Sequence, residues 1–111
     1  MGWTRAAARS LAYHQAVAAK LLTDADPVID LARTNLERLR SNDPGGRGRR
    51  WLDEWDRLIG QPVDELVTAM LSGTPAAIDL RQMTPFAGAV SPAERDGAIA
   101  SVTRTRVAHA S

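Results

Sequence analysis

The chain has 111 residues, of which 44% are hydrophobic and 5% aromatic, and its 14 basic and 13 acidic residues leave a formal charge of +1. A nearly neutral chain has no global field to attract nucleic acid, and a chain without cysteine forms neither disulfides nor cysteine-ligated zinc sites. No apolar run approaches the roughly 18 residues of a membrane span, and the first residues lack the apolar core of a signal peptide behind them. We therefore expect one cytoplasmic domain spanning residues 1–111.

Alanine and leucine dominate the composition and β-branched runs are few, which favours helices over strands. Signals for the start of a helix recur along the chain, each with a proline at or near the first helical position. They predict an all-α fold, an irregular bundle of five to six helices of uneven length. These signals are Asp26-Pro27, Pro62, Thr74-Pro75 and Ser91-Pro92.

The first predicted helix runs from about Thr4, a plausible N-cap, to Leu22. A period of 3.6 residues places six side chains on its apolar face and turns Arg9, Tyr13 and Lys20 away from it. His14 on that face is either a histidine at the core edge bonded to a backbone carbonyl, or a partner contact or pH-sensitive site. The apolar face comprises Ala7, Leu11, His14, Ala18, Leu21 and Leu22.

A second helix is expected to begin with Asp26 as its N-cap and to carry Asn35 within its apolar stripe, where Asn35 either bonds a neighbouring helix or faces an interface. The Gly- and Pro-rich residues 41–48 predict a flexible loop. Arginines follow at the end of this loop, and a Gly/Arg segment either tracks a phosphate backbone or is simply solvated. The arginines concerned are Arg47, Arg49 and Arg50.

The third helix, about Arg49 to Ile59, has a dense apolar face with two tryptophans as core anchors. Its acidic residues Asp53, Glu54 and Asp56 diverge by about 100° per residue, so they predict a solvated face and not a paired-carboxylate site. A fourth helix starts at Pro62 and stops at Gly73. Its outward face carries no side chain suited to reading bases, so we expect no DNA recognition by it.

The stretch after the fifth helix is the most informative part of the chain. Thr84-Pro85 ends the helix that starts at Thr74-Pro75, and Phe86 is expected to be a buried plug in the turn that follows. Ser91 and Glu94 form a complete capping box around Pro92.

The final helix, from Pro92 to about Arg106, has two apolar residues between two arginines on its best face. It is either a docking helix for a partner's carboxylates or a frayed end of the chain. Residues 107–111 are expected to be disordered.

Catalytic chemistry is not visible in this sequence. The glycines at 45–48 lack the spacing of a nucleotide-binding loop, no serine has a credible base partner, and no cluster has the spacing of metal ligands. We therefore expect a binding protein without catalytic residues, cofactor or metal. An enzyme or small-molecule binder is the less favoured alternative.

Two motifs carry a resemblance to a known family. The first is Ser10-Leu11-Ala12-Tyr13-His14, and the second runs from Leu80-Arg81-Gln82 through Pro85-Phe86-Ala87-Gly88 to the Pro92–Arg95 helix start. In this order they resemble a family of small actinobacterial antitoxins, the MenA partners of nucleotidyltransferase-like MenT-type (AbiEii-like) toxins. The resemblance covers about residues 9–95. The chain departs from the family after Arg95, where no tryptophan follows.

The resemblance implies an antitoxin that neutralises a nucleotidyltransferase-like toxin, an enzyme acting on tRNA, by direct protein–protein binding. The alternative is a nucleic-acid-binding transcriptional regulator that uses Arg47, Arg49 and Arg50, and DNA is therefore a possible second partner. No membrane partner is expected. The predicted partner contacts are Arg81, Phe86, Arg95, Ile99, Val102 and Arg106, with Tyr13 and His14 as lesser candidates.

Overall fold

The computed structural model describes residues 4–97 and Ala100. This part of the chain is all-α, as predicted, and contains no strand. Five helices are followed by a shorter helical segment over residues 92–97, so the prediction of an irregular bundle of five to six helices is confirmed. The five helices are α1 (Arg5–Thr23), α2 (Ala25–Ser41), α3 (Arg49–Ile59), α4 (Val63–Met70) and α5 (Pro75–Gln82).

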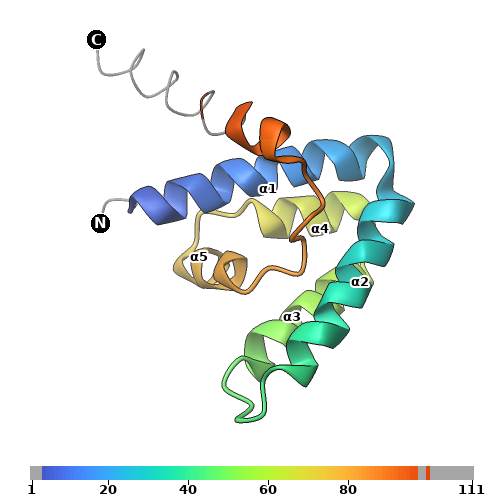
Figure 1. Cartoon of the computed structure of the whole chain (residues 1–111), viewed down its shortest axis with the longest axis vertical. Helices are drawn as coiled ribbons and strands as arrows, with labels where there is room; N and C mark the ends of the chain where they lie inside the picture. Colours follow the sequence, from blue (N-terminus) through green and yellow to red (C-terminus); the bar gives the residue numbers. More distant parts are fainter. Residues whose placement is uncertain (1–3, 98–99, 101–111) are drawn as a thin grey trace.

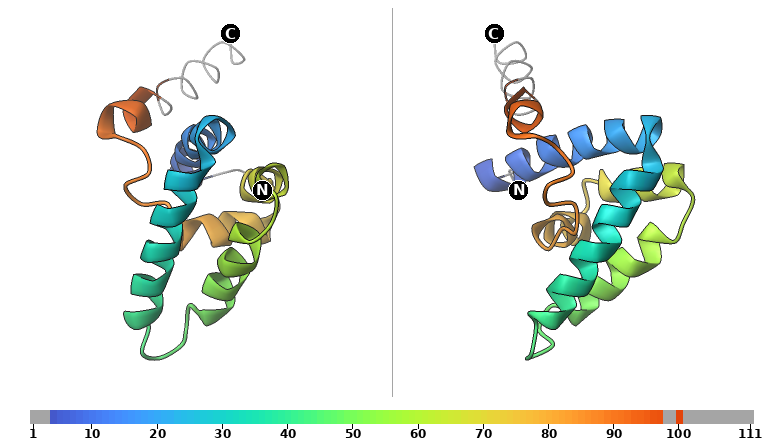
Figure 2. Two further views of the ribbon diagram at one scale, coloured as in Figure 1. Left: turned by 90° about the vertical axis from the view of Figure 1, so that its right-hand side faces the viewer. Right: turned by 45° about the vertical axis from the view of Figure 1, so that its right-hand side comes forward.

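The helices form two arms that share one hydrophobic core. α1 and α4 lie side by side in one arm, and α2 and α3 form an antiparallel hairpin in the other (Figure 1). α5 lies in the angle between the arms (Figure 1) and contacts α1, α3 and α4. The chain after α5 crosses back between the arms and carries residues 92–97 over α1 (Figure 2). This crossing places residues 84–88 next to α1.

Local signals explain several helix ends. Thr4 caps α1 by accepting a hydrogen bond from the Ala7 amide at 3.0 Å, and Thr74 caps α5 by accepting one from the Ala77 amide at 3.2 Å. α3 has the predicted bounds. Salt bridges from Arg40 to Asp53 (2.8 Å) and Asp56 (3.5 Å) tie α2 to α3 at the surface.

Three predictions about α1 and α2 were wrong. α2 begins two residues earlier than expected, with Asp24 as its N-cap, and Asp26 lies inside the first turn. Leu22, assigned to the apolar face of α1, is 65% exposed. Tyr13, assigned to the outer face, packs against the core instead. Tyr13 lies inward because the chain after α5 covers its side of α1, where the Phe86 carbonyl accepts a hydrogen bond from its hydroxyl.

The loop between α2 and α3 is a series of hydrogen-bonded turns over residues 42–48, while Ser41 belongs to α2. Asp43 organises it: its carbonyl accepts from the Gly46 amide at 3.0 Å and its carboxylate accepts from the Gly48 amide at 3.0 Å. The Gly46 backbone has a φ of 67°, a conformation that glycine adopts without steric cost.

An aromatic cluster stands at the centre of the core. The Trp55 and Phe86 rings meet edge to face at 5.5 Å, and the His14 ring lies nearly parallel to Trp55 at 6.2 Å. Both Trp55 and Phe86 have no exposed surface, so the prediction of a buried Phe86 is confirmed. The Trp55 indole donates a hydrogen bond to the Leu80 carbonyl at 2.9 Å, which fixes the end of α5 against α3.

Candidate functional site

The chain after α5 is held to α1 by two neighbouring side chains. The Tyr13 hydroxyl donates to the Phe86 carbonyl at 2.6 Å, and His14 Nε2 lies 2.8 Å from Thr84 Oγ1. The Thr84 oxygen also accepts from the Phe86 amide at 3.1 Å. The two sequence motifs therefore bind each other: residues of the first hold the backbone and side chains of the second.

The surroundings of His14 define its protonation. Its Nδ1 lies 2.7 Å from the Ser10 carbonyl, which can only accept, so Nδ1 carries the proton and Nε2 accepts from the Thr84 hydroxyl. Burial lowers the pKa of His14 from 6.5 to about 4; the hydrogen bond to Ser10 opposes this shift and the positive charge of Arg81 adds to it. His14 is neutral at pH 7, with both ring nitrogens engaged.

α2 holds the same segment from the other side. The buried Asn35 donates from Nδ2 to the carbonyls of Pro85 at 2.8 Å and Ala87 at 2.9 Å. Its carbonyl oxygen accepts from Arg38 at 2.9 Å, which fixes the orientation of the amide. Asn35 thus bonds the crossing chain, and not a neighbouring helix.

Arg81 is an interior residue. Its side chain is among the most completely buried in the chain, and it donates to the carbonyls of Met70 and Ser72, both at 2.8 Å. These carbonyls lie at and just after the end of α4, where helices leave backbone acceptors without intrahelical partners. Burial lowers the pKa of Arg81 from its usual value.

A surface groove of about 790 Å³ lies where α1, the crossing chain and residues 92–97 meet. The Tyr13 ring, Ala87 and Val90 supply part of its lining, and its charged residues are Arg9 on α1 with Arg95 and Asp96 on the facing segment. Burial raises the pKa of Tyr13, although the amides of residues 88–90 and the charge of Arg95 act in the opposite direction. The full lining is Arg9, Ser10, Tyr13, Thr84, Ala87, Gly88, Val90, Pro92, Arg95 and Asp96.

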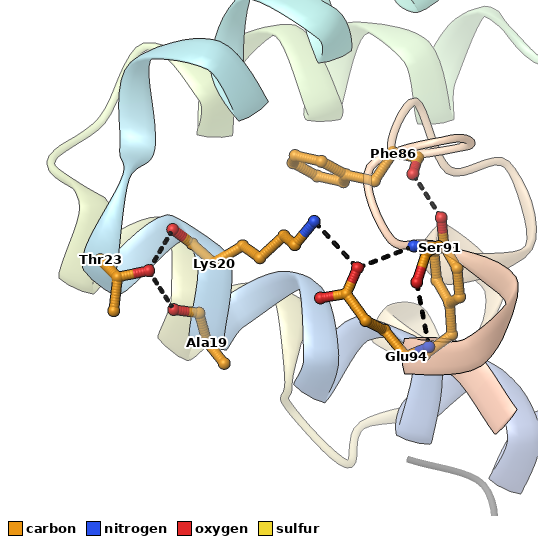
Figure 3. A network of polar contacts seen from close by, with 7 residues as sticks. Ala19, Lys20, Thr23, Phe86, Ser91 and Glu94 are labelled. Atoms are coloured by element: carbon orange, nitrogen blue, oxygen red, sulfur yellow. Dashed lines mark hydrogen bonds and ion pairs between the residues drawn. The ribbon is translucent and has the colours of Figure 1, made fainter. Parts of the chain in front are cut away.

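One wall of the groove is fixed by Glu94. Its carboxylate accepts from the Ser91 amide at 3.0 Å while the Ser91 hydroxyl accepts from the Glu94 amide at 3.1 Å, so the structure forms the predicted capping box. The same carboxylate binds Lys20 of α1 at 3.0 Å (Figure 3). Its hydrogen bonds to Ser91, together with Lys20, lower the pKa of Glu94.

The structure divides the predicted contact residues into two groups. Tyr13 and Arg95 line the groove, whereas His14, Arg81 and Phe86 are 1%, 2% and 0% exposed and do not reach the surface of the folded chain. The placement of these three on a contact surface is therefore corrected: burial in the aromatic cluster and hydrogen bonds to backbone carbonyls engage their side chains. Ile99, Val102 and Arg106 lie outside the described residues, as does the predicted tail over residues 107–111.

The three arginines of the nucleic-acid alternative, Arg47, Arg49 and Arg50, are all exposed. The Arg50 guanidinium lies 4.6 Å from the centre of the Trp51 ring, within reach of a cation–π contact. Arg50 and Trp51 border a smaller hollow of about 390 Å³ between α3, α4 and α5.

Sequence reasoning missed Arg9, which the apolar periodicity placed on the outer face of the first helix. Its position beside the groove depends on where the crossing chain returns, and no signal within the helix reports that. Among the described residues no group of three potential ligands could hold a metal ion, and no described helix is long and apolar enough to cross a membrane.

The chain was compared with protein-family models, curated proteins and solved structures, and nothing in any of the three matched it.

Proposed function

We propose that this chain is an antitoxin that binds a nucleotidyltransferase-like, tRNA-modifying toxin directly and thereby inhibits it. One observation carries the proposal: the two motifs that resemble the antitoxin family are in contact, through Tyr13 to Phe86 and His14 to Thr84. The hydrogen bonds that join the two motifs are partly buried and bridge 73 and 70 positions of the sequence. The pairing of the motifs supports the view that the resemblance reflects a shared structural unit.

Binding is favoured over catalysis by the way the polar side chains are used. The histidine nearest the groove has both nitrogens engaged in structural hydrogen bonds, and general acid–base catalysis would need one of them to be available. Arg81 is likewise committed to two backbone carbonyls. The groove keeps two exposed arginines, Arg9 and Arg95, which suit it to contact another molecule.

The test is co-expression with the product of the neighbouring gene, followed by size-exclusion chromatography at micromolar concentration. The proposal expects a single complex whose thermal unfolding temperature exceeds that of the isolated antitoxin, because binding only the folded state stabilises it. Two separate species at that concentration would contradict it.

The second candidate function is nucleic-acid binding by the loop arginines, which the exposure of Arg47 and Arg49 favours. Binding through these side chains would weaken steeply with salt. The triple change Arg47→Ala, Arg49→Ala and Arg50→Ala should abolish binding to DNA in a mobility-shift titration. Unchanged affinity for DNA in the triple variant would remove this candidate.

A further inference from the structure

We propose that the groove between α1 and residues 92–97 binds an acidic polypeptide segment of the partner, with Arg9 and Arg95 as the two carboxylate anchors. The inference rests on the proposed function and names the chemistry by which that partner is recognised. It does not follow from the family resemblance, because the position of Arg9 beside the groove is known only from the folded chain.

The charge of the groove is the first argument. Its lining holds two arginines and a single carboxylate, Asp96, so it is net positive on a chain whose total formal charge is only +1. Within the described part of the chain Arg9 forms no ion pair. The Arg95 Nε lies 3.7 Å from Asp96 Oδ1, and both side chains are more than half exposed, so water screens this pair and it holds Arg95 only weakly.

The placement of the arginines is the second argument. Arg9 is on α1 and Arg95 is on the segment that faces it, so a chain lying in the groove would meet one guanidinium on each side. A guanidinium binds a carboxylate through two parallel hydrogen bonds, which gives direction as well as attraction. Two such anchors on opposite walls would select a segment with two suitably spaced acidic side chains.

The groove is shaped before any partner arrives. Its outer wall is held to α1 by the Lys20–Glu94 ion pair, and the Ser91–Glu94 capping box fixes the turn that starts this wall. Its floor is held by Tyr13 and Asn35 through three hydrogen bonds to the carbonyls of Pro85, Phe86 and Ala87. A preformed site loses less conformational entropy on binding, so more of the interaction free energy appears as affinity.

The lining favours a polypeptide over a phosphate backbone. The same lining includes Tyr13, Ala87, Val90 and Pro92, which suit apolar side chains that alternate with acidic ones. Binding a nucleic-acid backbone requires a track of several cations, whereas this lining holds two. An acidic segment with interspersed apolar residues matches both the charges and the apolar surface.

The experiment uses the full chain and a fluorescent, end-blocked peptide in which glutamate and leucine alternate, followed by fluorescence anisotropy. Two further probes are the same peptide with glutamine in place of glutamate and a short oligothymidine. The glutamate peptide is also titrated at high salt. We expect binding of the glutamate peptide alone, weakened by salt. Equal binding of the glutamine peptide, preference for the oligothymidine, or no binding of the glutamate peptide would each overturn the inference.

The variant carrying Arg9→Glu and Arg95→Glu should bind the glutamate peptide at least about tenfold more weakly. Arg33→Glu, together with Arg5→Glu, provides the matched control, because these exposed arginines do not line the groove and the change in net charge is the same. All four positions are exposed, so circular dichroism should show unchanged folding. An equal loss of affinity in the control variant would show that net charge and not the groove causes binding.

The same variants separate this inference from the proposed function. If the wild-type chain forms the toxin complex and the Arg9→Glu, Arg95→Glu variant forms it equally well, the groove assignment fails and the antitoxin proposal stands. If the wild-type chain forms no complex, the antitoxin proposal fails, and the peptide titration still decides whether the groove takes acidic segments.

Discussion

His14 Nε2 and Thr84 Oγ1, separated by 70 positions in the sequence, lie 2.8 Å apart and share one hydrogen bond in the interior of the protein. Because Nδ1 donates its proton in a hydrogen bond to the Ser10 carbonyl, Nε2 can accept from Thr84 only while the histidine is neutral. The first helix and the chain after α5 are therefore coupled through a group that titrates.

Acid should weaken the fold through His14. Its pKa is lowered from 6.5 to about 4 in the folded chain. Between these two pH values His14 is therefore protonated in the unfolded chain but neutral in the folded chain, which favours unfolding. The stabilisation is present in full above about pH 6.5 and is lost progressively as the pH falls toward 4. Between pH 7 and pH 5 the free energy of unfolding should drop by about 2 kcal/mol. Urea denaturation at a series of pH values measures this.

His14→Gln is the control for the pH dependence. It removes the titrating group, so the variant should be less stable at pH 7 and its stability should change little between pH 7 and pH 5. The carboxylates Glu54 and Glu94, whose pKa values are lowered from 4.5, contribute only at lower pH. A wild-type slope retained in His14→Gln would mean that another group is responsible.

Phe86→Ala should cost about 3–5 kcal/mol in the free energy of unfolding. The ring is fully buried and meets both Trp55 and His14 edge to face, so its removal leaves a cavity and breaks the aromatic cluster. Leu22→Ala, at a position that is 65% exposed, should change the same quantity by less than about 0.5 kcal/mol. Similar denaturation midpoints for the two variants would contradict the packing described here.

Several of these features could be predicted from the sequence, and they share a local cause. The caps at Thr4 and Thr74, the Ser91–Glu94 box and the bounds of α3 depend on residues within one turn of each other. Phe86 could be placed in the core because a lone aromatic residue in a turn has few other uses.

The rest depends on where distant segments meet. Arg81 was expected at a contact surface because it lies in the motif that carries the family resemblance, but the carbonyls of Met70 and Ser72 accept its hydrogen bonds in the interior. Tyr13 was placed on the outer face because periodicity describes one partner surface, whereas α1 is covered on a second side by the crossing chain. The groove and the role of Arg9 arise from that same crossing.

Asn35→Asp should destabilise the fold by roughly 2 kcal/mol or more at pH 7. It keeps the size of the side chain but replaces the two donated hydrogen bonds to Pro85 and Ala87 with an acceptor facing two carbonyls. Asn42→Asp makes the same chemical change at an exposed position at the end of α2 and should cost less than about 1 kcal/mol. Thermal denaturation of both variants checks the difference. Equal stabilities would argue against a stabilising role for the hydrogen bonds from Asn35 to Pro85 and Ala87.

Gly88→Ala should cost about 1–2 kcal/mol in the free energy of unfolding. Gly88 has a φ of 83°, which a residue with a Cβ rarely adopts, while the space around it is open, so the cost comes from the backbone alone. At Gly60, where φ is −79° and an added Cβ would make only ordinary contacts, the same change should be nearly neutral. Chemical denaturation of the pair would contradict the assignment if Gly60→Ala were the more harmful change.

The most direct test of the central claim is nucleotide transfer to tRNA by the neighbouring gene's product, measured while this chain is titrated into the reaction. We predict that transfer falls to background once the chain reaches a stoichiometric amount. The folded fraction of His14→Gln should inhibit transfer at pH 7 as strongly as the wild-type chain, because its groove arginines are intact. Undiminished transfer in the presence of excess folded wild-type chain would contradict the account.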